Sequence, residues 1–259
     1  GDASAPLSTG RWTVRLRGLP GARRARYDGW HGLAPSLGGS RVRYEGRLAD
    51  DRMTVGAPAT GRRMLAIGAY ATRTAWSTGR GGMGAYDAAR FPAIVGDLAF
   101  FSSRGPSRDG RTLPHLTAPG VGVISSLSRH ARRTFAPSFV IGAGPRAGYA
   151  VLQGTSMAAP HAAGVVALAL ALDPTLEPED LAELFRRTAR VDDQVRDGLF
   201  AGAPGPPPND DWGAGKLDAP RLLEALLARA GRTTTSGRRA TTTAPLTDEA
   251  RLRPAEARR

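Results

Sequence analysis

The chain has 259 residues, enough for one sizeable domain with a buried core, and its 36 lysine and arginine residues outnumber its 23 aspartate and glutamate residues to give a net charge of +13. It contains no cysteine, which excludes disulfides, thiolate nucleophiles and cysteine-bound metals. Its longest apolar run, residues 162–172, is too short to cross a bilayer, and its arginines are scattered without interleaved aromatic residues, so we expect neither a membrane nor a nucleic-acid partner.

An alternation of apolar and polar residues near the N-terminus predicts two strands, each with one buried face. The pattern occupies residues 11–17 and returns in residues 40–48, and the loops between are rich in glycine, proline and arginine. We therefore predict a small antiparallel β segment within residues 1–55, with one face in contact with solvent.

Short continuous apolar runs closed by glycine follow in residues 64–70, 93–101 and 120–127. Such runs are typical of strands that are buried on both faces of a sheet. Between them, residues 77–87 form a glycine-rich loop that lacks the Lys-Ser/Thr pair of a phosphate-binding loop. The sequence predicts one domain over residues 56–230.

Local signals then predict three helices. The first begins at Ser156 and ends at Asp173, because the proline that follows disfavours helical backbone at the residue before it. The second spans about residues 178–190, with proline in its first turn and glutamate near the positive end of its dipole. The third begins near Asp218, a good N-cap residue. Few large apolar side chains remain in residues 231–259, which we predict to be a disordered tail.

The tripeptide Gly154-Thr155-Ser156 at the start of the first helix allows two interpretations. A serine there is commonly an N-cap whose hydroxyl accepts a backbone N–H. It is also well placed as a nucleophile, because unpaired N–H groups and the positive end of the helix dipole suit a developing oxyanion. His161 follows five residues later, and that spacing turns its side chain away from Ser156. A base for Ser156 should therefore come from elsewhere.

A longer string around Ser156 resembles the serine motif of the subtilases, the subtilisin-like serine peptidases. The string is GTSMAAPHAAG, residues 154–164, and the match is long and specific. Three other segments also resemble subtilase segments in the family's order: TVGAPATGRRMLAIGAY (residues 54–70), FSSRGPSRDGRTLPHLTAPGV (residues 101–121) and DWGAGKLDA (residues 211–219). The resemblance covers about residues 54–228.

The resemblance implies an α/β fold, namely the C-terminal part of a subtilisin-like, doubly wound parallel sheet, with a small antiparallel β insertion. It implies hydrolysis of peptide bonds in polypeptide substrates through an acyl-enzyme on Ser156, whose backbone N–H is one oxyanion donor. It also implies that His161 is a structural residue of the helix, and that the protein is extracellular, as most subtilases are.

The family's other catalytic motifs are missing from the sequence. Subtilases carry an aspartate and a histidine in glycine-containing motifs, and then an oxyanion asparagine, all before the serine. His31 is followed by glycine, but a proline and a glycine pair break the helix that should come next. His115 stands where subtilases usually have aspartate, and His130 lies in a basic loop. The one asparagine, Asn209, comes after the serine in a proline-rich loop.

Two explanations remain for these absences. The chain is the C-terminal part of a subtilase whose Asp, His and Asn lie upstream of Gly1, or it is a pseudopeptidase, a non-catalytic binding module with a subtilase shell. The intact serine motif favours the first explanation, because everything missing falls on the N-terminal side of one cut. We therefore expect the isolated chain to be inactive, and the missing N-terminal part of the same domain to be its partner.

No cofactor is assigned from the sequence. Calcium is common in the family, but Asp192, Asp193 and Asp197 lie in an arginine-rich stretch and are interpreted as a solvated helix end rather than a metal site.

Overall fold

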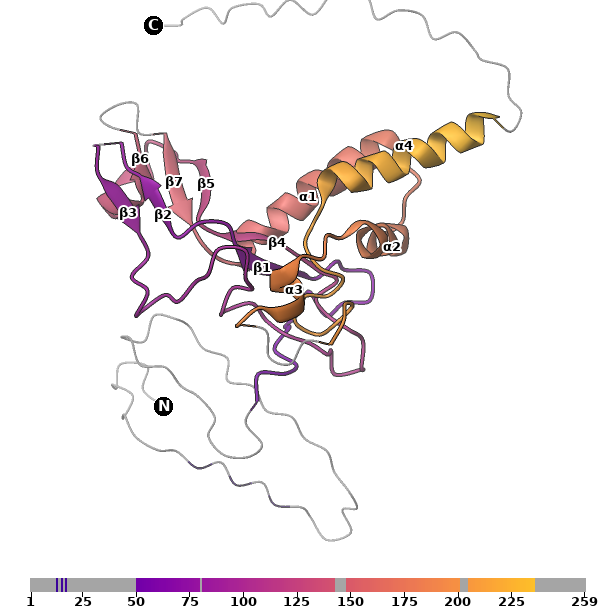
Figure 1. Ribbon diagram of the computed structural model, residues 1–259, viewed down its shortest axis with the longest axis horizontal. Coiled ribbons are helices and arrows are strands. Elements are labelled where there is room, and N and C mark those ends of the chain that lie inside the picture. Colours follow the sequence, from indigo (N-terminus) through magenta and orange to yellow (C-terminus); the bar gives the residue numbers. More distant parts are fainter. Residues whose placement is uncertain are drawn as a thin grey trace, which may run out of the picture. The chain divides into compact units, whose positions relative to one another are not determined.

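The computed structural model describes residues 50–79, 81–142, 148–200 and 205–235, together with Thr13, Arg15 and Arg17 (Figure 1). The chain divides into two units, residues 1–49 and residues 50–259, and the described helices and strands all belong to the second. The β segment predicted for residues 1–55 therefore lies almost entirely outside the described residues.

Two parallel strands, β1 (Ile67–Ala71) and β4 (Leu116–Val121), form the centre of the fold. Small side chains such as those of Ala69 and Ala118 are fully buried in this pair, as expected for strands covered on both faces. Residues 97–99 hydrogen-bond to the other side of β1, and residues 215–217 do the same for β4. With helices packed on it, the parallel pair makes the fold α/β, as the sequence predicted.

The described helices are α1 (Thr155–Leu172), α2 (Pro178–Thr188), α3 (Asp193–Asp197) and α4 (Ala219–Thr235). Helix α1 packs on both parallel strands, α4 lies beside α1, and α2 packs against α4 (Figure 1). Large apolar side chains fill the space between them, among them Leu116, Phe185 and Leu222. Three of the helices match the sequence predictions and α3 is an addition. Helix α4 also continues past residue 231, where the sequence predicts a disordered tail.

Local sequence sets the ends of α1 and α2. Asp173, which precedes Pro174, has extended backbone and ends α1. Helix α2 begins with a capping box, in which the side chains of Glu177 and Asp180 each accept a backbone N–H of the other residue. These signals act within a few residues, so the sequence alone predicted both helices.

Helix α1 is the one described helix that is long and apolar enough to cross a membrane, judged by length and composition alone. It exceeds the apolar run 162–172 because it begins at Thr155. Core helices pass the same test. In α1, Ala158, Ala162, Val165 and Ala169 are buried against the core, and the other residues are partly or fully exposed. The length of α1 is therefore weak evidence for a membrane span.

Antiparallel strands gather at one end of the parallel pair (Figure 1). Strand β2 (Ala75–Ser77) pairs with β3 (Met83–Ala85). Strands β5 (Val123–Ser126), β7 (Tyr149–Leu152) and β6 (Val140–Ile141) form a second sheet in the order β5-β7-β6. We call these strands, with the short 3-10 turns η1 (Arg132–Thr134) and η2 (Pro137–Phe139), the antiparallel module. Trp76 links β2 to η2, the turn that precedes β6, because its indole N–H donates to the Ser138 carbonyl at 2.7 Å.

Two of the apolar runs differ from the sequence prediction. Residues 93–101 form turns instead of a strand and make a single bridge to β1. The buried Asp97 holds these turns, since its carboxylate accepts N–H groups from Leu98 and from Leu199. In residues 120–127, β5 is antiparallel and largely exposed, so burial on both faces was the wrong interpretation.

Candidate active site

Ser156 lies at the carboxyl end of the central strand β4, which is where open α/β sheets bind their ligands. Strand β7 ends at Leu152, and the Gly154 N–H then donates to the Gly120 carbonyl at the end of β4, at 2.8 Å. A Cβ atom on Gly120 would lie 2.5 Å from the Cβ of Ala69, so only glycine permits this close approach. The turn that carries Ser156 is thus held against the sheet.

Gly154 directs the chain into α1 through an unusual backbone conformation. Its φ of 143° and ψ of 160° fall in a region that is essentially restricted to glycine. Gly154 is the N-cap of α1, and no side chain caps this helix. The serine hydroxyl is therefore not a cap, and the N-cap interpretation of Ser156 is wrong.

The first turn of α1 presents an exposed hydroxyl together with free backbone donors. Ser156 is exposed and its hydroxyl makes no hydrogen bond among the described residues. The N–H groups of Met157 and Ala158 turn back to the Gly154 carbonyl, whereas those of Thr155 and Ser156 have no partner in the described part of the chain. Free donors at the positive end of a helix dipole stabilise an oxyanion.

His161 is held by its own helix. Its Nδ1 lies 2.8 Å from the Met157 carbonyl, and because a carbonyl only accepts, Nδ1 carries the proton. Pro160, the residue before His161, has no N–H and therefore cannot form the helical hydrogen bond to the carbonyl of Ser156, one turn earlier in the helix. These contacts agree with a structural role for His161 in α1.

The two other described histidines, His115 and His130, make no hydrogen bond to Ser156 either. His130 is exposed in the loop before η1, and His31 lies outside the described residues. His115 is half-buried, and its Nδ1 accepts the Ala66 N–H at 3.0 Å. Burial lowers the pKa of this imidazole. His115 lines a cavity of roughly 390 Å³ at the amino ends of β1 and β4, the opposite end from Ser156.

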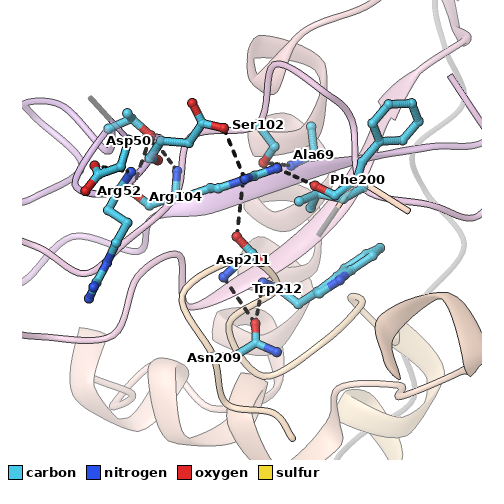
Figure 2. Close-up of polar contacts among 12 residues, drawn as sticks. Asp50, Arg52, Ala69, Ser102, Arg104, Phe200, Asn209, Asp211 and Trp212 are labelled. Atoms are coloured by element: carbon cyan, nitrogen blue, oxygen red, sulfur yellow. Dashed lines mark hydrogen bonds and ion pairs between the residues drawn. The ribbon is translucent and has the colours of Figure 1, made fainter. Parts of the chain in front are cut away.

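Asn209 shapes the loop before Trp212, and its amide is held there by hydrogen bonds within that loop. Its Oδ1 accepts the N–H groups of Asp211 and Trp212 at 3.1 and 2.8 Å (Figure 2). Its Nδ2 donates to the Gly205 carbonyl at 2.8 Å. Arg104, which pairs with the buried Asp211 at 3.2 Å, fixes the same loop from the other side. Both groups are structural.

Of the three aspartates interpreted as a solvated helix end, Asp193 and Asp197 lie in α3, and Asp192 precedes it and is partly buried. Asp192 accepts the Val195 N–H as the N-cap of α3, and both of its oxygens bond the Lys216 ammonium, at 2.9 and 2.7 Å. Its charge is therefore already compensated. Among the described residues, no group of three or more potential ligand side chains could hold a metal ion.

Tyr86 is a contact of the serine turn that sequence analysis missed. Its hydroxyl accepts the Gly122 N–H at 3.3 Å and donates to Oε1 of Gln153, immediately before Gly154, at 3.1 Å. Burial raises the pKa of the Tyr86 hydroxyl, so it remains a donor. The ring stacks on Phe91 with centroids 4.5 Å apart. No sequence signal identifies Tyr86, because it lies within residues 77–87, which are interpreted as a glycine-rich loop.

Comparison with known proteins places this geometry in a family. The chain is 46% identical to pyrolysin of Pyrococcus furiosus over 79 residues, which are 30% of this chain and 5% of pyrolysin. It is 28% identical to the serine protease AprX of Bacillus subtilis over 141 residues, covering 54% and 28% of the two chains. It is 33% identical to an uncharacterized protein of Aquifex aeolicus over 140 residues, covering 54% and 56%. The chain thus spans about half or less of these relatives.

A solved structure with some likeness is the CspB protease of Clostridium perfringens, with a TM-score of 0.44, 25% identity, and coverage of 69% of this chain and 29% of that one. The model of the subtilase family, peptidase S8, matches residues 47–215, which is more than half of the chain. This chain therefore belongs to the subtilase family of serine peptidases.

Proposed function

We propose that the chain is the C-terminal part of a subtilisin-like endopeptidase domain, in which Ser156 is the nucleophile. The observation that carries the proposal is the exposed, unbonded Ser156 hydroxyl in the uncapped first turn of α1, at the carboxyl end of β4. Ser156 Oγ gives its proton to the base and attacks the carbonyl carbon of a peptide bond. The C–N bond then breaks, the amine leaves with that proton, and the acyl-enzyme remains. Water hydrolyses the acyl-enzyme, which releases the carboxylic acid and restores the Ser156 hydroxyl. The Ser156 N–H donates to the oxyanion of each tetrahedral intermediate.

We expect the base and the side-chain amide donor to the oxyanion to come from residues other than the described ones. Serine needs a base at neutral pH, and losing one oxyanion donor costs about 100- to 1000-fold in rate. His115, His130 and His161 make no hydrogen bond to Ser156 in the described structure, and the Asn209 amide is bonded within its own loop. We place the aspartate, histidine and amide in polypeptide upstream of Gly1, and expect the chain alone to be inactive.

An uncovered surface of α1 supports a partner of this kind. Only four residues of this apolar helix are buried, and Leu168 and Leu172 are 53% and 48% exposed. Apolar side chains on a central helix are stabilised when further chain covers them. The proposed upstream part of the domain is the occupant that we assign to this face, with polypeptides as substrates and the extracellular space as location.

The test compares the chain alone with the chain produced together with the upstream part of its own reading frame, using casein hydrolysis. We expect turnover only in the longer protein, and its loss in Ser156→Ala. Turnover by the chain alone that requires Ser156 would contradict the missing-partner proposal and direct attention to His31. An inactive longer protein that still binds polypeptides would favour the pseudopeptidase alternative.

A further inference from the structure

The outer edge of β5 in the antiparallel module carries backbone groups without partners. The sheet order β5-β7-β6 makes β5 an edge strand. The Leu127 N–H donates to the Gly148 carbonyl at 2.7 Å, and this bond continues the ladder between β5 and β7. Hydrogen-bonded pairs alternate in an antiparallel ladder, so Ile124 and Ser126 direct their N–H and C=O groups away from β7. None of these four groups has a partner among the described residues.

A contact at one end shows that this edge accepts a hydrogen-bond partner. Gly122 lies two residues before Ile124 and faces the same outer edge, and its N–H donates to the Tyr86 hydroxyl. Beyond it the edge is open, since Ile124 is 39% exposed and Ser126 is also exposed. Unpaired strand edges pair readily with an extended chain, which adds to the sheet as a further strand.

The segment that leaves β5 places unpaired positive charge at the other end of the edge. Residues 128–135, here called the arginine turn, fold back through N–H bonds to the carbonyls of Ser128 and Ala131. The turn exposes Arg129, His130 and Arg133. None of the three side chains has an ion-pair partner in the described structure.

The charges in this part of the chain lack nearby carboxylates. Several exposed arginines elsewhere have one, such as Arg186 with Glu183 at 2.6 Å and Arg196 with Asp193 at 3.4 Å. In contrast, residues 110–172, which contain β5, the arginine turn and Ser156, include no aspartate or glutamate. A surface of one sign without counter-charges attracts partners of the opposite sign.

We propose that the outer edge of β5 and the arginine turn form a docking site for an extended acidic polypeptide segment. Backbone pairing with Ile124 and Ser126 requires N–H and C=O groups that repeat along an extended main chain, and a peptide has such a main chain whereas a nucleic acid does not. Carboxylates of the segment meet Arg129 and Arg133 in charge-assisted hydrogen bonds.

The site is also placed to serve the nucleophile. Strand β5 starts opposite Leu152, four residues before Ser156, so a peptide along β5 runs from the arginine turn toward the serine. That the docked segment belongs to a substrate rests on the proposed function, whereas the binding itself does not.

The test measures binding by fluorescence anisotropy to the full chain carrying Ser156→Ala. The probe is a short fluorescein-labelled peptide of alternating glutamate and valine, compared with the same peptide with glutamine for glutamate and with oligothymidylate. We expect the acidic peptide to bind most tightly, and its affinity to fall as salt is raised. Tighter binding of the glutamine peptide or of oligothymidylate would overturn the proposal.

Two matched pairs of variants separate the edge from the charge. Ser126→Pro removes an outward N–H without breaking the ladder to β7, and Ser126→Ala is its control. Arg129→Gln with Arg133→Gln removes two unpaired charges, and Arg196→Gln with Arg221→Gln removes two paired ones. We expect the first variant of each pair to bind the acidic peptide about tenfold more weakly, and the control to bind unchanged.

Equal binding by Ser126→Pro and Ser126→Ala, with circular dichroism showing both folded, would refute pairing at the β5 edge. Equal binding by the two double-arginine variants would refute the charge contribution. Because these measurements need no catalysis, their failure is distinct from failure of the proposed peptidase activity, which the hydrolysis assay reports.

Discussion

Replacing Asp192 by asparagine is expected to destabilise this protein more than replacing its partner Lys216 by methionine. Lys216 is 1% exposed, and its ammonium bonds both Asp192 oxygens. Asparagine still caps α3, so Asp192→Asn isolates the loss of charge. It leaves a buried ammonium whose remaining neighbours are the Tyr70 and Trp212 rings, 5.0 and 5.3 Å away. Removing one partner of a buried pair typically costs about 3–5 kcal/mol, and we expect about 3 kcal/mol here because the rings offset part of the loss.

The substitution Lys216→Met leaves Asp192 without its ammonium partner, and Asp192 is less buried than Lys216. Lys216→Met keeps an apolar stem in the buried site, while the Asp192 side chain is 29% exposed and retains the Val195 N–H and Arg190 at 3.7 Å. The lost charge-assisted hydrogen bonds then cost about 1–2 kcal/mol.

Urea unfolding of the parent, the two single variants and the double variant measures these free energies. The double variant should lose less than the sum of the single losses, because it buries no unpaired charge. A loss in Lys216→Met equal to or greater than that in Asp192→Asn would refute the argument from burial.

Three further changes test other parts of the structure. Gly154→Ala should lower the free energy of unfolding by about 1–3 kcal/mol, because the backbone φ of 143° at this position is strained for alanine. Gly164→Ala should raise the free energy of unfolding by about 0.5–1 kcal/mol, because the added Cβ meets open space within a helix. Thermal unfolding that shows the same sign of change for both variants would contradict this. Burial lowers the pKa of His115 in the folded state, so its contribution to stability is complete above the unfolded pKa near 6.5 and falls as the pH drops below that value. His115→Asn keeps an acceptor for the Ala66 N–H and should lose this pH dependence in urea titrations. An unchanged pH dependence would exclude His115 as its source. Asn209→Ala removes the acceptor of two N–H groups and should cost about 1–3 kcal/mol in the same assay, and a loss within error of zero would show that water replaces it.

Sequence analysis succeeded where the controlling signals are local. The predicted first helix, from Ser156 to Asp173, differs by one residue at each end from α1, because Gly154 and Pro174 act on their immediate neighbours. The nucleophile candidate came from a long motif, and the structure adds that its hydroxyl does not cap the helix. The absence of a capping bond could not be predicted, since it depends on the conformation of Gly154.

The sequence predictions failed where contacts between segments distant in the chain determine the local structure. An apolar run such as residues 93–101 does not distinguish a buried strand from buried turns. Turns form in residues 93–101 because the Asp97 carboxylate accepts N–H groups from a segment about a hundred positions later in the chain. Strand β5 is exposed for a similar reason, because it pairs with β7 at the surface rather than joining the parallel pair. Tyr86 reaches Gln153 across 67 positions, and no local pattern encodes that contact.

The central claim is that Ser156 is the nucleophile of a working peptidase. The most direct measurement treats the protein as isolated from its native host with a fluorophosphonate probe and locates the adduct by peptide mass spectrometry. The account requires a stoichiometric adduct on Ser156 that forms far faster than on other serines, in a protein that also contains aspartate and histidine motifs upstream of Gly1. An unlabelled Ser156 in that native protein would contradict the account and leave a binding function for the subtilase fold.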